Sequence, residues 1–67
     1  MTLEDRQTIN AMIKYGGSFE QMLGKATQFA DDINLAKIKS TWPECWAFYK
    51  QKGIEDKDFS EGMSKLL

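Results

Sequence analysis

The eight residues WPECWAFY, Trp42–Tyr49, hold four of the chain's eight aromatic residues, together with its single proline and its single cysteine. Pro43 fits the first position of a helix, where its fixed φ is favourable and its missing N–H costs nothing. Gly53 follows two lysines, Lys50 and Lys52, and this pattern is typical of the end of a helix. The stretch therefore predicts a helix that begins at Pro43 and stops at Gly53.

One face of this helix is expected to carry most of its large apolar side chains. At about 100° per residue, one stripe contains Trp42, Cys45, Trp46 and Tyr49, while Phe48 lies at its edge. Two interpretations stay open. Either all five side chains are buried in the core, or Phe48 and one indole edge form an exposed patch that binds a partner. The candidate partner-binding residues of this helix are Trp42, Phe48 and Tyr49.

The segment before it predicts a short helix as well. Asp31 and Asp32 offer a cap at its start, and Leu35, Ile38 and Trp42 then align on one side. The residue before a proline is pushed out of the α region, so the helix should end at Trp42.

Two more helices are predicted nearer the start of the chain. The first begins after Thr2, which can cap it, and runs to Tyr15, where Gly16 and Gly17 interrupt the pattern. Its inward-facing residues are Ile9, Met12 and Ile13. The second begins at Ser18, which forms a capping-box pattern with Gln21. Its apolar stripe is the cleanest in the chain and predicts the central helix of the core: Phe19, Met22, Leu23, Ala26, Phe29, Ala30 and Ile33.

These elements predict an all-α fold, a compact orthogonal bundle of four short helices. The connections are too short to reverse every helix neatly, which favours crossed packing over an up-and-down bundle. We expect a helical core domain over residues 1–53 and a different segment over residues 54–67, which is acidic and interrupted by glycine.

Residues 54–67 carry apolar side chains at helical spacing: Phe59, Met63, Leu66 and Leu67. Two interpretations stay open for this segment. It forms a fifth short helix docked on the core, or it is an amphipathic tail that becomes ordered on a partner or on a second copy of the chain. Phe59 and Met63 complete the set of candidate partner-binding residues.

Composition excludes most catalytic and cofactor chemistry. The chain has 67 residues and fits one domain; it contains no histidine, one cysteine and no glycine-rich phosphate loop. We therefore expect no enzyme, no cofactor and no metal site. Nine basic residues against ten acidic ones give little attraction for duplex nucleic acid. The absence of a membrane-length apolar segment and of a signal peptide predicts a cytoplasmic protein.

Several short motifs of the chain carry a family resemblance. The succession YGGSF at residues 15–19, Ala30-Asp31 followed by Asn34, and Pro43-Glu44 followed by Trp46 and Tyr49 resembles a group of small uncharacterised phage and prophage proteins. The recurring text of that group is a YGGSF turn, an AD-N turn and an FPEYW-type helix. The resemblance covers about residues 8 to 50 and implies phage provenance without an assigned activity. The chain departs from the pattern of this group at Trp42, Cys45 and Phe48. Because a charged residue is common at the position of Phe48, the resemblance favours exposure of that ring.

The preferred functional hypothesis is a non-catalytic interaction protein of phage type. Such a protein would bind a host or phage protein, for example a component of a defence system, and modulate or inhibit it; a homodimer is also possible. One alternative is a helix-turn-helix module that places Asn34, Lys37 and Lys39 toward nucleic acid. Another is a self-assembling structural component of a phage.

Overall fold

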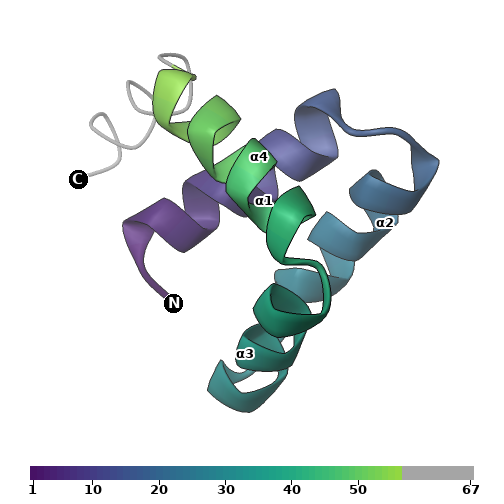
Figure 1. Ribbon diagram of the computed structural model, residues 1–67, viewed down its shortest axis with the longest axis vertical. Helices are drawn as coiled ribbons and strands as arrows, with labels where there is room; N and C mark the ends of the chain where they lie inside the picture. Colours follow the sequence, from purple (N-terminus) through teal and green to yellow (C-terminus); the bar gives the residue numbers. More distant parts are fainter. Residues whose placement is uncertain (57–67) are drawn as a thin grey trace.

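The computed structural model describes residues 1–56, which form four α-helices (Figure 1). Their bounds are α1 Leu3–Tyr15, α2 Ser18–Thr27, α3 Asp32–Thr41 and α4 Pro43–Glu55. The prediction of an all-α bundle of four short helices is confirmed. The possible fifth helix, with Phe59 and Met63, lies outside the described residues.

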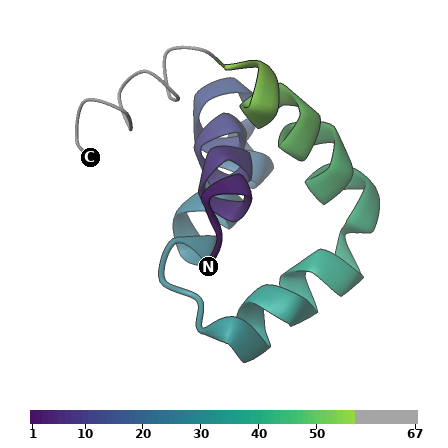
Figure 2. The same cartoon turned by 90° about the vertical axis from the view of Figure 1, so that its left-hand side faces the viewer.

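Helix α1 is the centre of the bundle, and α2 and α4 pack against it. Figure 1 shows α4 crossing α1, and the chain reversing its direction between α2 and α3. Figure 2 shows α3 and α4 following one another along an arc, in which α4 reaches α1 and α3 extends away from it. Helix α3 packs sparsely, against α4 and α2. Crossed packing of this kind follows from the short connections of the chain.

Two glycines let the neighbouring helices approach α1 closely. A Cβ at Gly24 of α2 would lie 3.0 Å from Cγ1 of Ile13 and 3.1 Å from Cβ of Met12. A Cβ at Gly53 of α4 would collide with the backbone carbonyl group of Gln7. At about 100° per residue, Gln7 lies on the side of α1 opposite Ile9 and Ile13. Helix α1 is therefore covered from two sides, which makes it the central helix.

Within residues 1–56, the core contains six buried apolar residues: Ile9, Ala11, Met12, Leu35, Trp46 and Tyr49. The sequence correctly placed Ile9 and Met12 inside, and Ile13 packs against them at the edge. Thr8 and Thr27 are also fully buried, and each hydroxyl donates to a carbonyl oxygen of its own helix, at 2.8 Å and 2.6 Å respectively. A buried hydroxyl that bonds its own helix leaves no unsatisfied polar group, so threonine can occupy the core.

The prediction that α2 carries the central apolar stripe is wrong. Only Leu23 and Ala30 of that stripe pack against the core. The exposed members are Phe19, Met22, Ala26, Phe29 and Ile33. The residues that α2 buries are instead Gly24 and Thr27. Gly24 lets this side of α2 pack closely on α1, because a Cβ there would lie only 3.0 Å from Cγ1 of Ile13.

Some of the helix ends agree with the caps predicted from the sequence, and others do not. Thr2 and Asp5 form a reciprocal capping box at α1, and Asp31 caps α3 by accepting from the Asn34 N–H at 2.8 Å. The capping box predicted for Ser18 and Gln21 is wrong, because Ser18 is already helical and Gly17 is the cap. The Gln21 side chain donates to the carbonyl of Gly16 instead, at 3.1 Å. Gly53 does not end α4, which continues to Glu55.

Trp42 joins α3 to α4. Its φ of −125° and ψ of 61° lie outside the helical region, as expected for a residue that precedes proline. Its N–H still donates to Ile38 and its carbonyl accepts from Trp46, both at 3.0 Å, so it belongs to the ends of both helices. Pro43 occupies the start of α4 as predicted. The result is a sharp corner with a large aromatic side chain at its tip.

Candidate functional site

The main exposed apolar surface of the described chain lies along α2. We call it the α2 face, and it consists of Phe19, Met22 and Ala26 of α2, Phe29 just after the helix, and Trp42 beside Phe19. Four of these side chains are large, and their exposed fractions are 55% for Phe19, 59% for Met22, 88% for Phe29 and 39% for Trp42. Scattered single apolar residues on a surface are ordinary, but a group of this kind marks a site of interaction.

The geometry of α2 explains why this surface is exposed. At about 100° per residue, Phe19, Met22 and Ala26 share one direction around the axis of α2. This direction differs by roughly 130° from the mean direction of Gly24 and Thr27. Because α1 holds the Gly24 side, the apolar side turns away from the core. The chain turns after Thr27, and the N–H of Phe29 donates to the carbonyl of Ala26 at 3.1 Å, so the backbone of Phe29 stays close to the end of α2.

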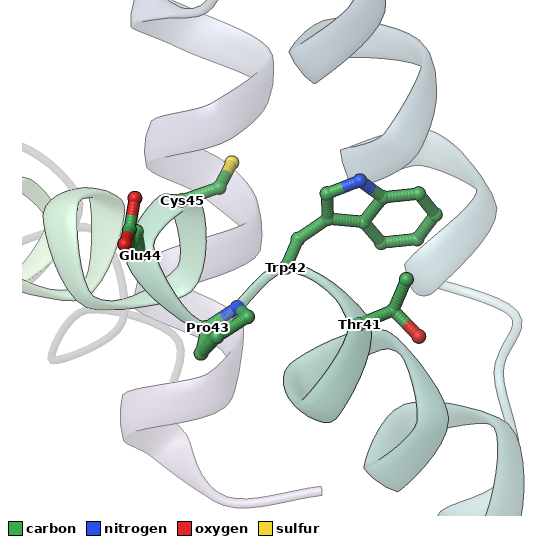
Figure 3. Close-up of a pocket in the computed structure, with 5 residues that line it drawn as sticks. All are labelled: Thr41, Trp42, Pro43, Glu44 and Cys45. Atoms are coloured by element: carbon green, nitrogen blue, oxygen red, sulfur yellow. The ribbon is translucent and has the colours of Figure 1, made fainter.

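Trp42 connects the α2 face to the corner between α3 and α4. The rings of Phe19 and Trp42 pack edge to face, with centroids 5.7 Å apart. Beside them lies a hollow of about 370 Å³ lined by Thr41, Trp42, Pro43, Glu44 and Cys45. Figure 3 shows the indole extending from the corner toward α2, with Glu44 pointing away from it. The α2 face thus combines protruding rings with an adjacent depression.

The polar groups near this corner offer little reactivity. Burial raises the pKa of the Cys45 thiol, and the charge of Glu20 raises it further. Burial likewise raises the pKa of the Tyr49 hydroxyl, with smaller contributions from Glu20 and Cys45. The Thr41 hydroxyl donates to the carbonyl of Lys37 at 2.7 Å. A thiol with a raised pKa is a poor nucleophile at neutral pH, so the corner is suited to contact rather than to covalent chemistry.

The structure separates the site residues that the sequence grouped together. Trp42 belongs to the α2 face, whereas Tyr49 lies in the core. Phe48 is 56% exposed, on another side of α4. The other two candidates, Phe59 and Met63, lie outside the described residues. Among the described residues, the sequence therefore missed Phe19, Met22 and Phe29 as surface residues because it assigned them to the core.

Phe48 forms a second, smaller aromatic surface. Its ring packs edge to face on Tyr49, with centroids 5.0 Å apart. The ammonium group of Lys52 lies 5.7 Å from the centre of the Phe48 ring and 5.9 Å from that of the half-exposed Tyr15. This surface joins the end of α1 to the end of α4, where Lys14 Nζ pairs with the buried Asp56 carboxylate at 3.1 Å. Neither the Lys52 contacts nor the Lys14–Asp56 pair was predicted from the sequence.

Lys39 has a different role from the one considered for nucleic acid binding. Its ammonium group lies 2.7 Å from a carboxylate oxygen of Asp5 and 5.2 Å from the centre of the Trp46 ring. It is half-buried. Asn34 and Lys37 are exposed on α3. Lys39 therefore joins α3 to α1 and α4 within the protein.

Some kinds of site do not occur within residues 1–56. No three histidine, cysteine or acidic side chains of this region gather in a way that could hold a metal ion. No helix of the same region has the length and apolar character needed to cross a membrane. Comparison of the protein with family models, with curated proteins and with solved structures finds no match.

Proposed function

We propose that this protein is a non-catalytic interaction protein that binds another protein through the α2 face. The observation that carries the proposal is the exposure of Phe19, Met22, Phe29 and Trp42, four large apolar side chains, against six buried apolar residues in the core of residues 1–56. Aromatic residues and methionine are enriched in protein interfaces, and tryptophan dominates binding energies. The resemblance to small phage proteins suggests a host or phage protein as the partner, whose activity is modulated or inhibited on binding.

A protein partner suits this surface better than a small molecule. Small-molecule sites are concave and contain a few polar groups that converge on the ligand. The hollow beside Trp42 is lined by five consecutive residues; the Thr41 hydroxyl is already bonded and Glu44 points away from the indole. A depression of this kind next to protruding rings can receive one apolar side chain of a partner, while the rings pack around it.

The test is affinity capture from host lysate with the tagged full-length protein and two variants, Met22→Glu and Phe48→Glu. Both side chains are more than half exposed, so neither change should unfold the protein. We expect the captured protein to be retained by Phe48→Glu and lost by Met22→Glu. With the purified partner, Met22→Glu should weaken binding at least about 30-fold, the effect of a hot-spot residue.

The two variants also distinguish the two aromatic surfaces of the molecule. Loss of the partner with Phe48→Glu alone would place the site on the Phe48 surface and contradict the α2 face. Micromolar binding of duplex DNA with a steep salt dependence would support the helix-turn-helix alternative, since neutralised phosphates release counterions. We expect no such binding, because the nine basic residues are balanced by ten acidic ones and Lys39 is engaged by Asp5.

A further inference from the structure

We propose that a second copy of this chain occupies the α2 face and forms a weak, symmetric dimer. The inference rests on the proposed function, because both use the α2 face as the binding surface. It names a second copy of the chain as a partner for this surface. In a symmetric pair the same residues meet from both sides, so a patch must be complementary to itself. The spacing of large and small side chains along α2 meets this requirement.

The fit follows from an antiparallel arrangement of the two α2 helices. A twofold axis close to Met22 places Met22 of one copy against Met22 of the other. Phe19, three residues earlier, then lies against the small Ala26 of the other copy, four residues later. Large side chains opposite small ones allow the helices to approach to about 8–10 Å. Antiparallel helices also place their opposite dipole ends together, which is favourable.

The available area sets the strength of this association. With about 200 Å² per ring, the exposed fractions of Phe19, Phe29 and Trp42 correspond to roughly 350 Å² of aromatic surface per copy. Adding Met22, two copies can bring together at most roughly 900 Å², which is below the range of stable interfaces and within that of weak, transient ones. A net charge of −1 per copy gives almost no repulsion. The area thus supports a dimer that forms at high concentration and dissociates on dilution.

Sedimentation equilibrium of the full-length protein over a range from about 10 μM to 1 mM tests the proposal. We expect the weight-average mass to rise with concentration toward twice 7.7 kDa. Met22→Glu should raise the dissociation constant at least tenfold, because it places two carboxylates together at the axis. Phe48→Glu, matched in chemistry and exposure, should leave the constant unchanged. A protein that remains monomeric throughout overturns the proposal.

Disulfide formation tests the arrangement directly. In a Cys45→Ser background, Met22→Cys should form a covalent dimer under mild oxidation, since a residue near the axis meets its own copy within disulfide range. Gln51→Cys, at an exposed position of α4, should stay monomeric under the same conditions. Equal cross-linking of the two variants overturns the proposal. So does an intramolecular disulfide in a Met22→Cys, Met63→Cys variant, which would assign the face to residues 57–67 of the same chain.

The two proposals can fail separately. A monomeric protein whose captured partner is still lost with Met22→Glu contradicts the dimer and leaves the binding function intact. A dimer broken by Met22→Glu, without any captured partner that depends on Met22, supports the dimer and contradicts the binding of a different protein.

Discussion

Single residues decide how closely the helices of this protein approach. A Cβ at Gly53 would overlap the backbone of Gln7, and a Cβ at Gly24 would be tightly packed against Met12 and Ile13. Neither glycine has a positive φ, so close approach and not backbone conformation explains them. The sequence predicted that Gly53 ends its helix. A glycine that ends a helix and a glycine inside a helix that allows close packing can both follow two lysines, so the local pattern does not distinguish them.

Replacement of Gly53 by alanine should therefore destabilise the protein. Alanine favours a helix by up to about 1 kcal/mol over glycine, but its Cβ collides with the Gln7 backbone and forces α4 away from α1. We expect Gly53→Ala to lower the free energy of unfolding by about 1–3 kcal/mol in urea denaturation, as overpacking does. Gly17→Ala, whose Cβ would meet only the end of the Glu20 side chain, should cost less, about 0.5–1 kcal/mol, because it removes only the N-cap preference for glycine at α2. Equal effects of both variants would contradict close approach at Gly53.

At the scale of elements, the helices and the corner at Pro43 were predictable, whereas the orientation of α2 was not. Local signals such as the Thr2 and Asp31 caps act within a few residues of sequence and were read correctly. The side of α2 that faces α1 depends instead on a contact between Gly24 and residues of another helix. Apolar periodicity identifies the stripe but does not reveal whether a neighbour in the same chain covers it.

The candidate site was predicted only in part from the sequence. Phe48 was recognised as a side chain at the edge of its stripe, and it is exposed. Tyr49 was assigned to the partner surface but is buried, and Phe19 and Met22 were assigned to the core but are exposed. The edge position of Phe48 is a local property of its helix, whereas the exposure of Phe19 and Met22 depends on which side of α2 packs on α1.

Stability measurements on two apolar residues test this arrangement of the elements. Met22→Glu should cost less than about 1 kcal/mol, because the side chain is exposed and glutamate is a good helix former. Trp46→Ala should cost about 3–5 kcal/mol, because it leaves a cavity in the core. Thermal denaturation followed by circular dichroism at low protein concentration measures both. A Met22→Glu variant that unfolds as completely as Trp46→Ala would show that the α2 stripe is core.

At the scale of the whole molecule, α3 depends on polar contacts for its position. It packs sparsely, and its buried apolar contribution to the core is Leu35. Lys39 adds the pair with Asp5 of α1 and the contact over the Trp46 ring of α4. Three helices therefore meet at one ion pair, whose carboxylate is nearly buried. Because Trp42 lies at the end of α3, this ion pair also supports the position of the α2 face.

The stability of the folded protein should therefore fall on acidification through the titration of Asp5. Burial alone would raise the pKa of Asp5, but hydrogen bonds from Lys39 and Thr2 outweigh it and lower the pKa below its ordinary value. A lowered folded-state pKa stabilises the protein above the unfolded value of about 4, and this contribution is lost as the pH falls through the folded value. We expect Asp5→Asn to have a lower melting temperature than the parent protein at pH 7. Its melting temperature should also fall less than that of the parent between pH 7 and pH 3. The control is Asp32→Asn, which changes an exposed carboxylate; its melting temperature should fall as much as that of the parent over the same pH range. Parallel curves for the parent and Asp5→Asn would show that this ion pair does not hold α3 in place.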